Sequence, residues 1–213
     1  LGFAGSNLLA AGNSATIFET PLLHINPSTL ETSPIADSNM LTNKLIFDEH
    51  NNTLYTLGFE RRQDSLITVL KSHSGGSMER SRARISYYGE DYSADMVLDR
   101  ETGTLFTTLG FAGIRMLSWS GFTNLEATDH IPRRLMVQGF WVYSLNSDGS
   151  ISIWDKRSGK RILDFYMFKD LEWVALFSNG EFYASPGGHN YVTVFNEEAL
   201  HLEEKSRYQR RIY

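Results

Sequence analysis

The residue types that carry acid–base or metal chemistry are scattered through this chain. Its six histidines stand at positions 24, 50, 73, 130, 189 and 201, and no pair has the HExxH or HxH spacing of a metal site. The absence of cysteine excludes disulfides and zinc–thiolate centres. No Gly-x-Ser-x-Gly elbow and no phosphate-binding Gly-x4-Gly-Lys-Ser/Thr loop occurs either. The sequence therefore predicts no catalytic residue, no metal and no cofactor.

Two short clusters bring a histidine next to carboxylates. Asp48-Glu49-His50 and Asp129-His130 both fall between predicted strands. A histidine beside carboxylates could bind a metal ion or act in catalysis. Turns, however, contain such polar residues simply because their side chains hydrogen-bond to the backbone. We interpret both clusters as solvated turns. Asn51-Asn52-Thr53 fits a glycosylation sequon, although a turn favours asparagine in any case.

The first candidates for binding a partner are three arginines at alternate positions, Arg80, Arg82 and Arg84. In an extended chain all three lie on one side, where arginine pairs well with carboxylates or phosphates. The segment 72–84 is therefore either a docking loop for an acidic or phosphorylated partner, or an outer hairpin whose charges protect its edge. Trp119 and Phe122 are the second candidate, either as an exposed aromatic anchor or as core.

Composition narrows the classes of partner. The net charge of −5 and the pI of about 5.7 argue against the basic field of a nucleic-acid-binding protein. No apolar run approaches the roughly 18 residues of a membrane-spanning helix. We therefore expect a protein or peptide partner, with no nucleic acid and no membrane span. Composition does not fix the compartment, since cytosolic and exported proteins can both lack cysteine.

An internal repeat specifies the elements that position these residues. Leu1-Gly2-Phe3-Ala4-Gly5 recurs unchanged at 109–113. Aligning the sequence from this repeated pentapeptide gives five copies of a short apolar strand. Each copy ends in a bulky residue, at Phe18, Leu70, Leu117, Trp154 and Phe195. The bulky residues are 52, 47, 37 and 41 positions apart, around a repeat period of roughly 40–45. Asp-, Asn- and Gly-rich turns separate the predicted strands, so the sequence predicts an all-β fold.

One repeat resembles a known family. Ser147-Asp148-Gly149-Ser150-Ile151-Ser152-Ile153-Trp154-Asp155 is similar to a consensus WD40 repeat, and the likeness extends over residues 1–200. It implies a β-propeller of four-stranded antiparallel blades, about five of them, as a whole ring or part of a larger one. The segment 172–185 is similar to the last blade of bacterial WD40-like proteins found beside caspase-like peptidases.

The repeats depart from this family in two respects. Only the fourth copy has Trp-Asp, and no copy has Gly-His at its usual place. The resemblance then implies that the Asp-His-Ser-Trp hydrogen-bond network of the family is missing and that packing between blades supplies the stability. Kelch and other propeller families remain alternatives.

The predicted blades cover approximately 1–30, 40–90, 94–130, 134–168 and 171–200. Residues 201–213 are expected to form a C-terminal extension, either a short helix or a closing strand at 210–213. The first blade has predicted strands at 7–12, 15–19 and 22–25 but no first strand. Because the chain opens inside a repeat, we expect it to be part of a longer protein. Upstream sequence, the segment after Asn196 or another polypeptide would supply the strand.

The repeat and the lack of catalytic motifs favour a non-enzymatic scaffold for protein–protein interaction, as a subunit or fragment of a larger protein or complex. This hypothesis rests partly on fold-level analogy. The alternative is a propeller-based hydrolase or carbohydrate-binding module with its site at the central channel.

Overall fold

The computed structural model describes the backbone of residues 2–4, 7–11, 22–25, 28–35, 40–62, 65–74, 81–88, 95–118 and 121–192, and the side chains of 23, 28–32, 41–60, 67–72, 95–118 and 121–192. Over these residues the chain is built from strands and two short 3-10 turns, with no α-helix. The sequence-based prediction of an all-β fold is confirmed.

The strands form four antiparallel sheets, and in each sheet consecutive strands of the chain are hydrogen-bonded neighbours. Sheet 1 contains β1 (Gly2–Ala4), β2 (Asn7–Ala11), β3 (Leu22–Ile25) and β4 (Thr32–Ile35). Sheet 2 contains β5 (Met40–Asp48), β6 (Thr53–Arg62), β7 (Ser65–Ser74) and β8 (Ser81–Tyr88).

The second half of the chain forms sheets 3 and 4. Sheet 3 contains β9 (Met96–Asp99), β10 (Thr104–Thr108), β11 (Ile114–Ser118) and β12 (Gly121–Asn124), with the 3-10 turn η1 (Gly110–Ala112) between β10 and β11. Sheet 4 has six strands, β13 (Pro132–Gln138), β14 (Trp141–Asn146), β15 (Ile151–Asp155), β16 (Arg161–Met167), β17 (Trp173–Phe177) and β18 (Phe182–Ala184). The 3-10 turn η2 (Gly188–Tyr191) follows and packs against β17.

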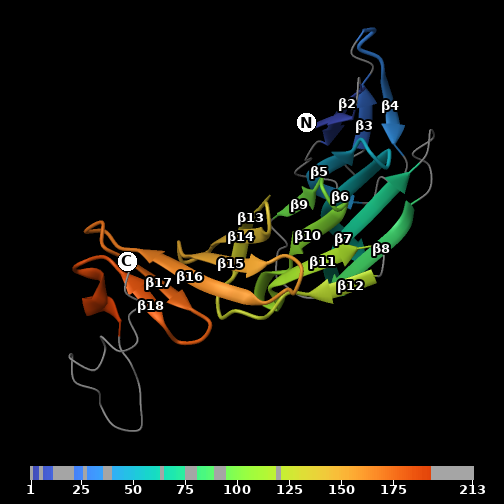
Figure 1. Ribbon diagram of the computed structural model, residues 1–213. Coiled ribbons are helices and arrows are strands. Elements are labelled where there is room, and N and C mark those ends of the chain that lie inside the picture. Colours follow the sequence, from blue (N-terminus) through green and yellow to red (C-terminus); the bar gives the residue numbers. More distant parts are fainter. Residues whose placement is uncertain are drawn as a thin grey trace.

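The first strands of the sheets lie next to one another. β1 contacts β5, β5 contacts β9, and β9 contacts β13, so the sheets succeed each other in chain order. Figure 1 shows this succession as a curved row, from the blue strands of sheet 1 to the orange strands of sheet 4.

Apolar side chains fill the spaces between neighbouring sheets. The cluster between sheets 2 and 3 consists of Leu57, Leu70, Met96, Leu98 and Leu105. The cluster between sheets 3 and 4 consists of Phe106, Ile114, Leu125, Val142 and Trp154. Sheet 3 is apolar on both faces because β10 sends Leu105 to one side and Phe106 to the other, as alternation along a strand requires.

Charged groups also join the sheets. Asp95 is buried just before β9, and its carboxylate forms an ion pair with Lys44 of sheet 2. The same carboxylate accepts a hydrogen bond from the backbone amide of Leu135 in sheet 4, with 2.9 Å between N and Oδ2. Lys156 of sheet 4 reaches Asp99 of sheet 3, with 2.8 Å between Nζ and Oδ2. Asp95 therefore links three sheets through one carboxylate.

A recurring turn closes three of the hairpins, at 48–52, 99–103 and 155–159. In each turn the side chain of the first aspartate accepts hydrogen bonds from backbone amides two or three residues later, which is the aspartate turn that the composition predicts. The fifth residue has a positive φ, of 46° at Asn52, 68° at Gly103 and 70° at Gly159. Glycine and asparagine tolerate this conformation best.

Two expectations about the units differ from the structure. We expected separate units at 134–168 and 171–200, but β16 pairs with β17, so strands from both ranges share sheet 4. We also expected no first strand in the first unit, whereas β1 pairs with β2 and occupies that place. The predicted strand at 15–19 lies outside the described residues.

The bulky residues of the repeat do not all face the same way. Leu117 and Trp154 point toward the preceding sheet, whereas Leu70 points toward the following one. Val69, which is fully buried on the other side of β7, is therefore the structural counterpart of Trp154. The repeat alignment was wrong by one residue in sheet 2, which exchanges the two faces of a strand. Phe18 and Phe195 lie outside the described residues.

Candidate functional site

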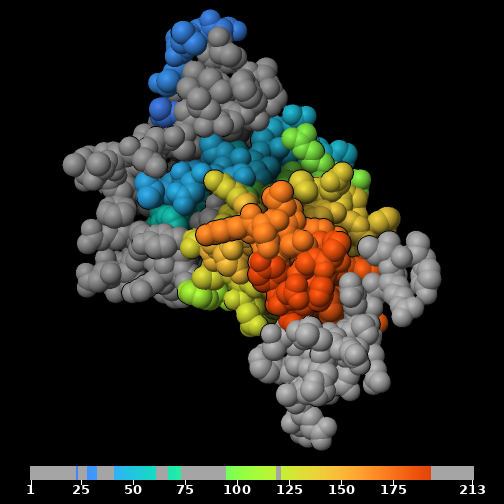
Figure 2. Space-filling view, turned by 90° about the vertical axis from the view of Figure 1, so that its left-hand side faces the viewer, coloured from blue at the N-terminus to red at the C-terminus, as the bar shows by residue number. Residues whose placement is uncertain are grey.

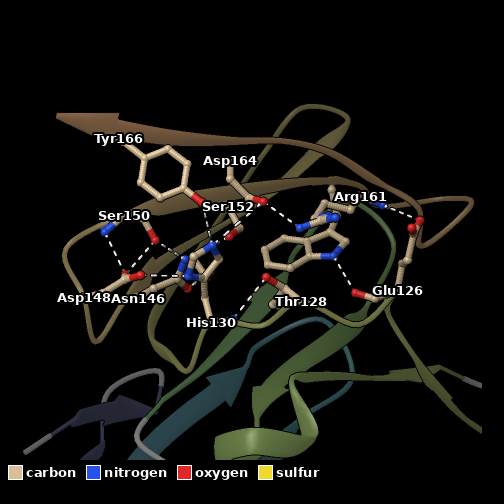
Figure 3. A network of polar contacts seen from close by, with 12 residues as sticks. Glu126, Thr128, His130, Asn146, Asp148, Ser150, Ser152, Arg161, Asp164 and Tyr166 are labelled. Carbon is tan, nitrogen blue, oxygen red and sulfur yellow. Dashed lines mark hydrogen bonds and ion pairs between the residues drawn. The ribbon is translucent and has the colours of Figure 1, made fainter. Parts of the chain in front are cut away.

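A cluster of polar side chains surrounds His130, where the connector between β12 and β13 passes over sheet 4 (Figure 3). The His130 side chain is only 15% exposed. Its backbone amide is held by the hydroxyl of Thr128, at 3.3 Å. The connector thus carries the imidazole inward, onto residues of β14, β15 and β16.

The imidazole has a partner at each nitrogen. Nδ1 lies 2.7 Å from Oδ2 of Asp148, and Nε2 lies 2.9 Å from the hydroxyl of Tyr166. A carboxylate only accepts, so Nδ1 carries the proton toward Asp148, and in the neutral ring Nε2 accepts from Tyr166. The Asp164 carboxylate lies farther off, 3.9 Å from Nε2. We call these four residues together with Arg161 the His130 network.

Asp164 is the most buried carboxylate of the network. Its Oδ2 accepts a hydrogen bond from Nη1 of Arg161, with 2.6 Å between the two atoms. Two further polar atoms at this pair, Oδ1 of Asp164 and Nε of Arg161, are buried without a hydrogen-bond partner in the structure. Buried polar groups usually have partners, so the pair is the least satisfied point of the network.

The surroundings set the protonation of two members. Partial burial acts to raise the pKa of Asp148, but hydrogen bonds from Ser150 and the neighbouring His130 outweigh it and lower that pKa below its ordinary value. Burial, reinforced by the charges of Asp164 and Asp148, raises the pKa of Tyr166. At neutral pH Asp148 is therefore a carboxylate and Tyr166 a phenol.

A ladder of small polar side chains continues from the network into the sheet. The amide of Asn146 donates to Ser150 at 2.9 Å and to Ser152 at 2.8 Å, while its oxygen accepts from Ser144 at 2.6 Å. All four residues are buried. Because these hydroxyls bond to Asn146, and that of Ser150 also to Asp148, they serve as sheet ties rather than as nucleophiles activated by His130.

Trp154 anchors the same connector from the other side. Its indole nitrogen donates to the backbone oxygen of Glu126 at 2.9 Å, and the Glu126 carboxylate accepts from the backbone amide of Arg161 at 3.0 Å. The connector is thus fixed to sheet 4 at both Glu126 and His130. The geometry can hold two sheets together, and the raised pKa of Tyr166 keeps it a phenol at neutral pH.

A second polar feature is a hollow of about 340 Å³ between the turns of sheets 2 and 3, lined by Asp48, Glu49, His50 and Arg100. The Asp48 carboxylate is occupied by the amides of its own turn and by the side chain of Asn51. Among the residues that the structure describes, no group of three or more histidine, cysteine or acidic side chains could hold a metal ion.

The predicted partner-binding residues are only partly described. Arg82 and Arg84 lie on β8, the fourth strand of sheet 2, with side chains outside the described set. Arg80 and Trp119 lie outside the described residues. Phe122 lies on β12 opposite Leu117, and its side chain is 48% exposed.

The interpretation of His130 as part of a solvated turn is wrong, because its ring is largely buried and paired with Asp148. The resemblance also implied that an aspartate–histidine network is missing, yet the pair exists. The two residues are 18 positions apart and lack the expected Gly-His context. A histidine shortly before a strand, with an aspartate in the next hairpin turn, was the signal that could have revealed the pair.

Searches against protein-family models and against curated proteins found no match for this chain. The described residues include no helix long and apolar enough to cross a membrane. The class that the fold and the site define is thus an all-β protein of antiparallel sheets, in which the buried Asp95 and the buried pair of Asp99 and Lys156 join neighbouring sheets.

Proposed function

We propose that the chain is a WD40-like β-propeller, or a part of one, and acts as a non-catalytic scaffold for protein–protein interaction. The observation that carries the proposal is the contact of each first strand with the next, from β1 to β5, β9 and β13. The radial repetition of a propeller would place the first strand of each blade next to that of the following blade, and this succession of contacts supports the proposal.

Details of sheet 4 support the same reading. The contact between Asp148 and His130 resembles two members of the Asp-His-Ser-Trp network of the WD40 family, which the sequence had led us to expect missing. Trp154 occupies the expected third strand, although its indole nitrogen bonds to Glu126 and not to a serine. The proposal therefore rests on a variant of the family pattern.

The scaffold role follows from what the polar groups do. Each side chain of the network contacts another member, although Oδ1 of Asp164 and Nε of Arg161 have no hydrogen-bond partner, and the hollow at the turns has mixed charge. Exposed aromatic residues offer contact points, including Phe140, which is 56% exposed with the Arg157 guanidinium 5.1 Å from its ring centre. Aromatic and arginine side chains are the residues that dominate protein interfaces.

A binding screen tests the scaffold role. The purified chain is applied to a peptide library and to a glycan array. Hits are remeasured with Phe140→Ser and with Phe111→Ser, at an exposed phenylalanine of η1, as a matched control. Peptide binding that Phe140→Ser weakens supports the scaffold. Glycan binding, or turnover of a hydrolase substrate panel, would instead favour a carbohydrate-binding or hydrolytic propeller.

A structure determination tests the architecture separately. An experimental structure of the chain in its natural full-length protein is expected to show the four described sheets around one common axis. Sheets that diverge from a shared axis would remove the propeller, whatever the chain binds.

A further inference from the structure

The hollow of about 340 Å³ between the first turns of sheets 2 and 3 is lined by polar side chains. Asp48, Glu49 and His50 come from the turn of sheet 2, and Arg100 comes from the turn of sheet 3. Figure 2 shows cyan residues of sheet 2 beside green residues of sheet 3 at the surface of the molecule. Most ligand pockets are lined mainly by apolar side chains, so this hollow suits a small and strongly polar ligand.

The backbone on both sides of the hollow is held in place. The buried Asp48 carboxylate accepts hydrogen bonds from the amides of His50 and Asn51, and from the Asn51 side chain at 2.7 Å. Across the hollow, the amide of Gly103 donates to the oxygen of Asp99 at 2.8 Å. The two turns touch, since a Cβ on Gly103 would lie 3.6 Å from the side-chain nitrogen of Asn51. A preorganised backbone of this kind lowers the entropy cost of binding.

The hollow presents two opposite charges that do not neutralise each other. Glu49 and Arg100 are exposed, and among the residues that the structure describes neither side chain forms an ion pair or a hydrogen bond. Glu101, the neighbour of Arg100 in the same turn, is by contrast paired with Lys156 of sheet 4, with 3.2 Å between Nζ and Oε2. Glu49 and Arg100 are therefore both available to a ligand.

The signs of these charges limit the chemistry of the ligand. A simple anion would meet the carboxylates of Asp48 and Glu49, and a simple cation would meet the guanidinium of Arg100, so each would face a like charge. A molecule that carries both an ammonium group and a carboxylate avoids this conflict. Glu49 can accept hydrogen bonds from the ammonium group, and Arg100 can donate two parallel hydrogen bonds to the carboxylate.

We propose that the hollow binds a free α-amino acid as its zwitterion, with the carboxylate at Arg100 and the ammonium group at Glu49. The volume of 340 Å³ equals that of about eleven water molecules, which matches the about ten non-hydrogen atoms of glutamine. Two exposed charge-assisted contacts give weak binding, with a Kd on the order of 1 mM. The inference depends on the turns of sheets 2 and 3 and not on the proposed propeller or its partners.

Three matched compounds test whether both charges are required. L-glutamine carries both charges, N-acetyl-L-glutamine lacks the ammonium group, and L-glutamine amide lacks the carboxylate. The isotope-labelled chain is titrated with each compound, and the backbone amide signals of residues 48–52 and 99–103 are followed by NMR. L-glutamine is expected to shift these signals. Each blocked compound is expected to bind about 10-fold or more weakly, because one charge-assisted contact is lost.

Two variants assign the contacts to their side chains. Arg100→Gln is expected to lower the affinity for L-glutamine to that for L-glutamine amide, and to leave the affinity for the amide unchanged. Glu49→Gln is expected to remove the difference between L-glutamine and N-acetyl-L-glutamine in the same way. Both side chains are exposed on turns, so both variants are expected to fold. Arg133→Gln, at an exposed arginine of β13, is the matched control and should leave the titrations unchanged.

Three outcomes overturn the proposal. They are turn signals that L-glutamine does not shift at concentrations up to about 20 mM, equal binding of the three compounds, and an affinity for L-glutamine that neither Arg100→Gln nor Glu49→Gln lowers. Each of these outcomes would leave the scaffold proposal standing, since peptide binding and the common axis of the sheets are measured independently.

Discussion

At the scale of single residues, His130 is held by more groups than its place in a connector suggests. The Asp148 carboxylate accepts from its Nδ1 and also from the amide and hydroxyl of Ser150. Asp148→Ala removes all three acceptor contacts and leaves a largely buried imidazole nitrogen unpaired. We expect a loss of about 1–3 kcal/mol in the free energy of unfolding, measured by urea denaturation. Asp129→Ala, beside His130 but exposed, is the control and should cost less than about 0.5 kcal/mol.

The ion pair between Lys156 and Asp99 predicts a pH dependence. Burial acts to raise the pKa of Asp99, but hydrogen bonds from Lys156 and from its own turn outweigh it and lower that pKa. The hydrogen bond with Asp99 raises the pKa of Lys156 despite desolvation. An acid whose pKa is lower in the folded state stabilises the fold at pH values above its unfolded pKa, about 3.9 for aspartate. A base whose pKa is higher in the folded state stabilises the fold at pH values below its unfolded pKa, about 10.4 for lysine.

The stabilisation from this pair is therefore expected to be complete between those two values. It is lost as the pH falls through the folded pKa of Asp99 and as it rises through that of Lys156. The difference in unfolding free energy between wild type and Lys156→Met should be constant near neutral pH and shrink at both extremes. Lys160→Met, at an exposed lysine nearby, should show a small difference without this profile; the same profile in both variants would refute the assignment.

Residue chemistry was the part least accessible to sequence reasoning. The turn aspartates were predictable because Asp bonds to the amides that follow it, a purely local interaction. His130 and Asp148 were not, since their pairing depends on how a connector lies over a neighbouring sheet. Asp95 is a similar case, because its two partners come from strands 40 or more positions away.

At the scale of elements, the aspartate turns show how one position decides a hairpin. Gly103 has a φ of +68°, and a Cβ added there would meet the Asn51 side-chain nitrogen at 3.6 Å, an ordinary contact. Backbone conformation alone therefore opposes substitution. Gly103→Ala is expected to cost about 1–2 kcal/mol of unfolding free energy.

Gly103→Asn is the matched comparison, because asparagine occupies the same place in the first turn, at Asn52 with a φ of 46°. Asparagine tolerates this region better, so the loss should be clearly smaller than for alanine. Equal losses, measured by thermal and urea denaturation, would mean that packing and not the backbone governs the position.

The repeated pentapeptide shows where element prediction stops. Gly2–Ala4 forms β1, whereas the same letters at Gly110–Ala112 form the 3-10 turn η1. The second copy turns because β10 ends at Thr108, whose amide bonds to the oxygen of Asp95, and Gly110 then adopts a φ of +56°. Identical sequences formed different elements because contacts outside the pentapeptide, here within sheet 3, decide where the strand ends.

At the scale of the whole molecule, stability is expected to reside between the sheets. Leu105 is 1% exposed and packs in the cluster between sheets 2 and 3. Leu105→Ala should cost about 2–5 kcal/mol, because a buried cavity forms. Phe122→Ala, at a half-exposed site of the same sheet, should cost less than about 1 kcal/mol. A comparable loss for Phe122→Ala, measured by urea denaturation, would show that the outer strand is part of the core.

The overall class was readable from the sequence, and the number of units was not. Alternating apolar residues between Asp- and Gly-rich turns suffice to predict antiparallel strands, because strand periodicity and turn chemistry are local. The merging of β16 with β17 is decided by hydrogen bonds across the turn at 168–172, including the amide of Phe168 to the oxygen of Glu172 at 2.8 Å. A repeat period of about 40 residues does not reveal whether such a turn ends a sheet or continues it.

The hairpin-by-hairpin order of the strands has a consequence for synthesis. Every described sheet comes from one continuous stretch of chain, so each can assemble as soon as that stretch leaves the ribosome, with short loops to close and little entropy to lose. Until the next sheet has been synthesised, the apolar face of the newest sheet is exposed to solvent. Translation speed and chaperone access at those moments, more than the final fold, would govern how much of the protein reaches its native state.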